Sequence, residues 1–148
     1  MCARETTRVQ ESILEPHVFI ILGATGDLTR RKLLPALYHL RDPGNVEKPT
    51  RLIVGAALPE MSEEAFRLWA YEGLHEAGGR NANELRAWCN TCLHYQTVRQ
   101  GGPQDYDALA RYIRQLERSR HMPENLVFYL ALPPATVPAT IEQLDRVG

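Results

Sequence analysis

The sequence predicts an α/β fold built on an open, mostly parallel sheet. Two runs of consecutive apolar residues, HVFIIL near the start of the chain and LVFYLAL near its end, are typical of strands covered on both faces. Between them, further strand patterns alternate with segments in which apolar residues recur at helical spacing. This alternation favours a parallel sheet with helices on both faces. Ligands of such sheets bind beyond the carboxyl ends of the strands, so the loops at those ends are the first places to look for chemistry.

The first strand, a helix and the second strand make up one βαβ unit. The first strand covers His17–Leu22 and runs directly into Gly23. From about Gly26 to Leu40, apolar residues recur at helical spacing and predict the helix. The second strand covers Arg51–Ala57, and the helix between the two strands favours a right-handed parallel crossover.

The rest of the chain repeats the alternation. Ser62 caps a helix that ends near Gly78, and a second apolar stripe runs from Leu85 to Cys92. The remaining predicted elements are a strand over His94–Val98, a helix from Asp105, a strand over Leu126–Leu132 and a final helix toward Val147. We therefore predict a Rossmann-like, doubly wound domain over residues 17–148, preceded by a polar tail over residues 1–16.

Composition narrows the class of function. A chain of 148 residues is long enough for one domain with a core of its own, and its net charge of −1 provides no field that would gather nucleic acid or an anionic membrane. No apolar run approaches the roughly 20 residues that a membrane span needs. The polar start of the chain does not resemble a signal peptide. We expect a cytoplasmic protein that binds neither nucleic acid nor membranes.

The cysteines suggest one alternative chemistry. Cys89 and Cys92 are spaced as in metal or redox motifs and lie close to His94, but a zinc site needs four ligands and Cys2 is remote. Both residues also fall on the helical apolar stripe, where free cysteines behave as small core residues. The core interpretation is favoured over a metal site.

The loop after the first strand is the strongest candidate site. Gly23 permits a tight turn, and small residues up to Gly26 let backbone N–H groups approach a pyrophosphate at the start of the helix. The alternative is a tight turn that binds nothing. Arg30 and Arg31 count against it, because cations in a first helical turn are unfavourable unless an anion lies nearby. Lys32 fits either reading.

Two motifs of the sequence resemble those of a known family. The segment His17–Leu40 resembles the opening of glucose-6-phosphate dehydrogenases, a strand followed by the pattern GxxGDLxxrKLxPxL. The segment Phe128–Pro134, FYLALPP, is similar to a second block of the same family at a similar distance. The resemblance spans residues 17–148. Between about residues 59 and 125 the chain matches the family in its general pattern and not in a specific motif.

The resemblance implies a function and a set of site residues. It implies NADP as the acceptor of hydride from glucose 6-phosphate, which yields the 6-phosphoglucono-lactone in the pentose phosphate pathway. Thr25 would contact the adenosine 2′-phosphate, Lys32 would lie where cofactor and substrate meet, and Pro134 would lie near the nicotinamide. The residues that would line the cofactor are Gly23, Ala24, Thr25, Gly26, Asp27, Leu28, Thr29, Arg30 and Pro134.

The chain departs from the family pattern at three points. Leu58 stands where the family commonly has an arginine that would bind the 2′-phosphate, so NAD remains an alternative to NADP. Val137 stands where an aromatic residue is common. The family's catalytic lysine, in an EKPFG motif, would fall just past Gly148. We therefore expect cofactor binding without turnover, and either self-association or pairing with a C-terminal catalytic domain.

Two other functions compete with this one. The motif GATG also opens short-chain-type reductases and epimerases, although the chain has Leu28-Thr29 where those enzymes carry a further glycine and it lacks their Tyr-x-x-x-Lys pair. A regulatory module that keeps the fold and has lost the cofactor is the non-enzymatic alternative, and failure to bind either dinucleotide would favour it.

Overall fold

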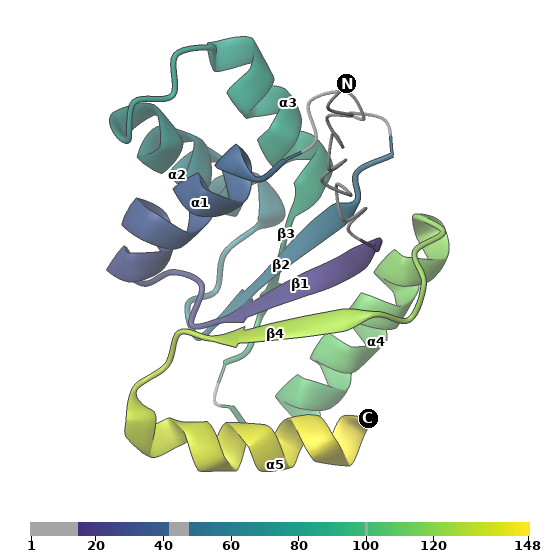
Figure 1. The fold of residues 1–148 in the computed structure, drawn as a ribbon. Coiled ribbons are helices and arrows are strands. Elements are labelled where there is room, and N and C mark those ends of the chain that lie inside the picture. Colours follow the sequence, from purple (N-terminus) through teal and green to yellow (C-terminus); the bar gives the residue numbers. More distant parts are fainter. Residues whose placement is uncertain (1–14, 42–47, 100) are drawn as a thin grey trace, which may run out of the picture.

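The computed structural model describes residues 15–41, 48–99 and 101–148. Its four strands are all parallel and follow the order β3-β2-β1-β4, which confirms the predicted α/β class (Figure 1). The strands are β1 (His17–Leu22), β2 (Arg51–Ala57), β3 (Leu93–Thr97) and β4 (Leu126–Leu130). Most of the predicted tail, residues 1–14, lies outside the described residues.

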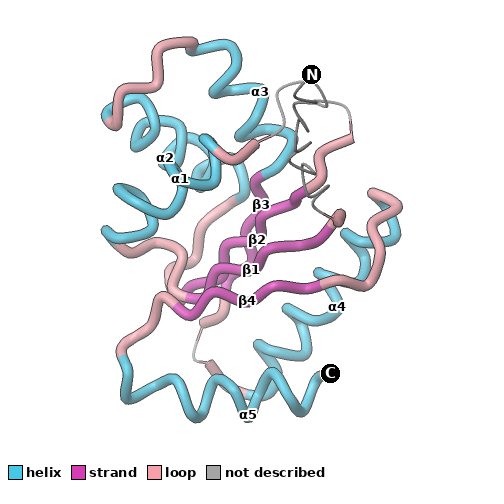
Figure 2. The backbone as a smooth tube through the Cα atoms, in the orientation of Figure 1, coloured by secondary structure: helices cyan, strands magenta, loops and turns pink. Residues whose placement is uncertain are grey.

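Helices cover the sheet on both faces, as the doubly wound prediction requires (Figure 2). One face carries the helix after β1, which comprises η1 (Thr29–Leu33) and α1 (Leu34–His39), together with α2 (Glu63–Glu76) and α3 (Ala82–Cys92). The other face carries α4 (Pro103–Ser119) and α5 (Val137–Val147), the latter after the short turn η2 (Pro134–Thr136). The predicted cap is confirmed, since Ser62 Oγ accepts a hydrogen bond from Ala65 N at 3.1 Å.

The helix after β1 differs from the regular helix predicted over residues 26–40. Residues Thr29–Leu33 form a π-helical turn, in which Leu34 N donates to Thr29 O. Pro35 lies directly after this turn; it has no N–H to donate, and its ring would clash with the carbonyl four residues earlier. The wider turn accommodates this proline and keeps the helix continuous.

The core lies in two layers, one on each side of the sheet. Ile21 of β1 packs among Leu34, Phe66 and Leu85 on the α1–α3 side. Ile20, its neighbour in the strand, belongs to the layer with Leu109 and Ile113 of α4 on the other side. Alternate residues of β1 therefore serve opposite layers, which is why the strand is apolar throughout.

Strand β4 corrects one expectation. Its apolar run predicts a strand covered on both faces, but β4 is an edge strand, and Val127, Phe128 and Tyr129 are 40%, 39% and 37% exposed. Among the described residues, no strand pairs with its outer side. The cause is tertiary: α5 packs against α4, and a cavity lined by Phe128, Leu144 and Val147 separates it from the strand.

Candidate functional site

The loops that follow the four strands meet at one edge of the sheet, because the strands are parallel (Figure 2). Segments far apart in the sequence come together there: the glycine turn after β1, the loop beginning at Leu58 after β2, Arg99 after β3, and Pro134 after β4. Ala131 N donates to Leu22 O at 2.9 Å, which joins the end of β4 to the glycine turn. The structure therefore brings the two family-like motifs side by side.

Gly23 is required by the fold itself. Its φ angle is +83°, and a Cβ atom at this position would lie 2.2 Å from Ala131 O. Its N–H donates to Ala56 O at 2.8 Å. Because any side chain would clash with the backbone of Ala131, the residue after β4, this glycine alone does not indicate a ligand.

Gly26 is different, since the fold does not need a glycine there. Its φ angle is not positive, and a Cβ atom would meet only Gly23 O, at 3.4 Å. The residue is exposed and begins the helix, where Arg30 N donates to its carbonyl at 3.2 Å. The next backbone N–H groups, those of Asp27 and Leu28, lie in the first turn and have no acceptor within the helix. A missing side chain beside free N–H groups fits a pyrophosphate at this helix start.

The side chains around these N–H groups vary in accessibility. Thr25 is half-buried, whereas Asp27 and Leu28 are exposed. The Asp27 carboxylate accepts from Arg31 Nε at 3.0 Å, and both side chains are largely in solvent. Ala24 is fully buried, and its N–H donates to Ala56 O at 3.2 Å, so it shapes the turn from within.

Two residues of the predicted site, Thr29 and Arg30, have structural roles. Thr29 is fully buried, so its side chain is not available to a ligand. Arg30 Nη1 donates to Glu76 Oε2 of α2 at 2.7 Å, and its side chain runs over Gly73. The hydrogen bond between them raises the pKa of Arg30 and lowers the pKa of Glu76.

This ion pair removes one argument for a ligand. The cation early in the helix already has an acidic partner 46 residues away, which the sequence pattern did not reveal. Lys32, the other cation of interest, is exposed on the same helix. The remaining case for anion binding rests on Gly26 and the free N–H groups.

At the ends of β2 and β3 the structure adds contacts that sequence reasoning missed. Leu58 is 65% exposed. Behind it, Tyr95 donates from its hydroxyl to Pro59 O at 2.6 Å and Val98 N donates to Ala57 O at 2.8 Å. Arg99 Nη2 lies 3.0 Å from Glu60 Oε1. Strand pairing brings these residues together, and no spacing within the chain indicates it.

The two cysteines of the described chain are core residues. Cys89 and Cys92 are buried in the layer with α2 and α3. Burial raises the pKa of Cys89 to about 12 and that of Cys92 to about 11. Within the described ranges no group of three or more His, Cys, Asp or Glu side chains could hold a metal ion. The burial of both thiols among core residues agrees with the core interpretation.

A polar cluster ties α2, β3 and α4 together beside the sheet. Tyr112 donates to Glu63 Oε1, and His94 Nδ1 lies 3.4 Å from the same oxygen. Burial lowers the pKa of His94. Burial would raise the pKa of Glu63, but the bond from Tyr112 and the nearby His94 and Arg67 hold it below its usual range.

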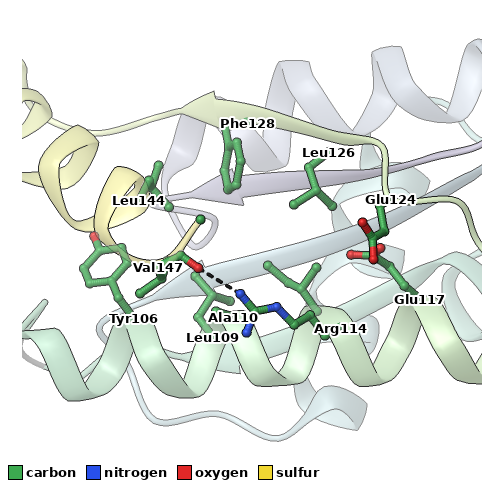
Figure 3. Close-up of a pocket in the computed structure, with 12 residues that line it drawn as sticks. Tyr106, Leu109, Ala110, Arg114, Glu117, Glu124, Leu126, Phe128, Leu144 and Val147 are labelled. Atoms are coloured by element: carbon green, nitrogen blue, oxygen red, sulfur yellow. Dashed lines mark hydrogen bonds between the residues drawn. The ribbon is translucent and has the colours of Figure 1, made fainter.

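A cavity of about 310 Å³ lies away from the loops at the strand ends (Figure 3). It separates β4 from α4 and α5, and Leu126 and Phe128 of β4 line one side of it. Arg114 donates to Val147 O at 2.8 Å across its other side. Glu117 lies buried at one end, where burial and the neighbouring Glu124 raise its pKa. The cavity opens on the incompletely covered strand, not on the glycine turn.

No helix in the described part of the chain is both long and apolar enough to cross a membrane.

Known proteins resemble this chain in both sequence and structure. The glucose-6-phosphate 1-dehydrogenase of Rhizobium meliloti is 36% identical over 126 residues, which are 82% of this chain and 24% of that protein. Glucose-6-phosphate 1-dehydrogenase 2 of Mycobacterium tuberculosis is 34% identical over 139 residues, 92% of this chain and 26% of that protein. The chain thus spans about a quarter of the length of these relatives.

The structural comparison agrees. A solved glucose-6-phosphate dehydrogenase in complex with its substrate glucose-6-phosphate has a TM-score of 0.73 and 27% identity, over 89% of this chain and 27% of that one. These findings leave the short-chain reductase alternative without support. Residues 20–148 match the family described as glucose-6-phosphate dehydrogenase, NAD binding domain. The chain therefore belongs to the family of glucose-6-phosphate dehydrogenase NAD-binding domains.

Proposed function

We propose that residues 17–148 bind NADP across the carboxyl edge of the sheet, with the pyrophosphate on the helix that begins after Gly26. The observation that carries the proposal is Gly26, a glycine for which the fold has no need, beside free N–H groups. The residues proposed to form the site are Gly23, Ala24, Thr25, Gly26, Asp27, Leu28, Thr29, Arg30 and Pro134. Ala24 and Thr29 are fully buried and support the turn from within, and Arg30 contributes by holding the helix against α2.

In the whole enzyme this domain serves glucose-6-phosphate oxidation. NADP, when bound, accepts the hydride from the anomeric carbon, and the sugar becomes a lactone. The domain orients the cofactor, and Lys32, which is exposed on the same helix, is the proposed contact where cofactor and substrate meet. Hydride transfer from an alcohol also needs a base within hydrogen-bond reach of the hydroxyl. We place that base outside this chain, and we expect the protein to act in the cytoplasm.

Calorimetric titration with NADP and with NAD tests the proposal. We expect saturable binding of NADP by the wild-type chain, and a large loss of affinity in Gly26→Ala, whose methyl group would cover the N–H groups of the first turn. If the folded wild-type chain binds neither dinucleotide, the proposal fails and a module that has lost its cofactor is the better description.

We further propose that β4 is covered by the part of the enzyme that lies outside the matched quarter of the relatives. The support is the exposed apolar edge of β4, the cavity beneath it, and the quarter-length match to the relatives. Exposed apolar side chains on an unpaired strand edge are typical of interaction sites.

The remaining segment of the Rhizobium meliloti enzyme, supplied in trans, provides the test for this surface. We expect it to bind the domain and to restore turnover of glucose 6-phosphate. Phe128→Asp should abolish binding, whereas Leu68→Asp should not, because Leu68 is 58% exposed on a different element, α2. Sedimentation that shows only dimers of the domain would assign β4 to self-association instead.

A further inference from the structure

The end of β2 lacks a group that this type of cofactor site needs. In dinucleotide-binding sheets of this kind, an acidic residue or an arginine beyond the glycine turn contacts the adenosine ribose or its 2′-phosphate. Here the residue after β2 is Leu58, an exposed side chain with no charge. An NADP site on this chain needs a cation from elsewhere.

Strand pairing brings a cation to the same place. Ala57 of β2 lies opposite Thr97 of β3, and the next residue of β3 still donates to Ala57 O at 2.8 Å. Arg99 therefore leaves the sheet beside the β2 end, about one strand spacing of 4.8 Å away. Its guanidinium reaches back over the loop after β2, where Nη2 lies 3.0 Å from Glu60 Oε1.

The loop that carries Glu60 is held in place by Tyr95 of β3. The Tyr95 hydroxyl donates to Pro59 O at 2.6 Å and lies 3.3 Å from Ala57 O. Tyr95 itself is buried in the core. The positions of Leu58 and Glu60 thus depend on the same strand, β3, that positions Arg99.

The ion pair is one that a phosphate can displace. The Arg99 and Glu60 side chains are 68% and 78% exposed, and exposed ion pairs contribute little to stability. A guanidinium binds phosphate through paired, charge-assisted hydrogen bonds, which are stronger than an exposed contact to one carboxylate oxygen. Arg31 is also exposed, but it lies on the helix after β1, beside the pyrophosphate turn, where Asp27 is its partner.

We propose that Arg99 binds the 2′-phosphate of NADP in place of an arginine at position 58, and that Glu60 opposes it as the acceptor that favours NAD. The inference rests on the proposed binding of a dinucleotide at this edge. The two opposed charges make the choice between NADP and NAD a property of one pair of side chains. NADP releases Arg99 from Glu60, whereas NAD leaves the pair intact and offers its ribose hydroxyls to the carboxylate.

The test compares dissociation constants for NADP and NAD, measured by calorimetry on the same chain. We expect Arg99→Ala to weaken the binding of NADP by about tenfold, because one charge-assisted contact is lost. The dissociation constant for NAD should change by less than about twofold. Glu60→Gln should strengthen NADP by about threefold, because a competing carboxylate is gone. Arg118→Ala removes the same charge from the last turn of α4, at the opposite end of the sheet, and should leave both constants unchanged.

The outcomes separate this inference from the proposed function. In Arg99→Ala, equal changes in the two dissociation constants, or no change in either, would overturn the role of Arg99. Weaker NADP binding in Glu60→Gln would overturn the role of Glu60 as its opponent. Both side chains are exposed, so we expect the variants to fold like the wild-type chain, and their melting temperatures check this. If the wild-type chain binds neither dinucleotide, the proposed function fails and this inference fails with it.

Discussion

Replacing the two glycines of the turn, one at a time, should separate what the fold requires from what the ligand requires. In Gly23→Ala the new methyl group would lie 2.2 Å from Ala131 O, at a φ of +83°. A left-handed conformation costs a non-glycine residue about 1–2 kcal/mol. Relief of the clash requires a backbone shift, which costs roughly another 1–3 kcal/mol. We expect a loss of about 2–5 kcal/mol in the free energy of unfolding, against about 5–15 kcal/mol for a typical domain.

Gly26→Ala should have the opposite profile. The new methyl group meets only Gly23 O at 3.4 Å and needs no change in φ. Alanine is poorer than glycine at the start of a helix but restricts the unfolded chain more, so the net change should stay within about 1 kcal/mol. Affinity for NADP should fall by about tenfold or more, because the methyl group occupies the approach to the first-turn N–H groups.

Urea denaturation and calorimetric titration measure the two quantities on the same samples. The reasoning is refuted if Gly23→Ala unfolds within about 1 kcal/mol of the wild-type chain, because the close approach to Ala131 would then have no energetic consequence. It is equally refuted if Gly26→Ala binds NADP as tightly as the wild-type chain. Titrations should be made at low temperature, where both variants are folded.

Three further predictions concern buried groups. On a Cys2→Ser background, Cys89 and Cys92 should resist a thiol reagent at pH 8 and react only on unfolding, because burial raises their pKa to about 12 and about 11; rapid reaction of either in the native domain would contradict their placement. Burial lowers the pKa of His94 from its ordinary 6.5, so the unfolded state takes up the proton first as the pH falls. The free energy of unfolding should be highest above pH 6.5 and decrease below it, with this group contributing at most about 1.4 kcal/mol per pH unit. Glu63, with its pKa lowered from 4.5, adds a further loss below pH 4.5. His94→Gln should flatten the decrease that begins at pH 6.5 in pH-dependent urea melts, and an unchanged decrease would exclude His94 as its source. Tyr95→Phe should lower the free energy of unfolding by about 1 kcal/mol, since Pro59 O loses its donor, and a larger loss would mean that the hydroxyl supports more than this loop.

Sequence patterns alone predicted the strands and helices closely. The first two strands have the predicted bounds, His17–Leu22 and Arg51–Ala57, and Ser62 caps its helix as expected. These features depend on residues close together in the chain: strand and helix periods, a capping hydroxyl, a glycine turn. The family resemblance rests on the same kind of local motif, and the comparisons confirm it.

The tertiary structure decided how these elements use one another. Arg30 is a helix-packing residue because Glu76 lies beside it, 46 residues away, and Arg99 meets Glu60 across 39 residues. Phe128 is half covered because β4 lies at the sheet edge, although its sequence is as apolar as that of β1. The sequence by itself determined the fold class and the glycine turn, since apolar periodicity and backbone conformation are local properties. Only the register of the strands and the packing of the helices decided which charges meet and which strand is open, because those depend on residues that the chain brings together from a distance.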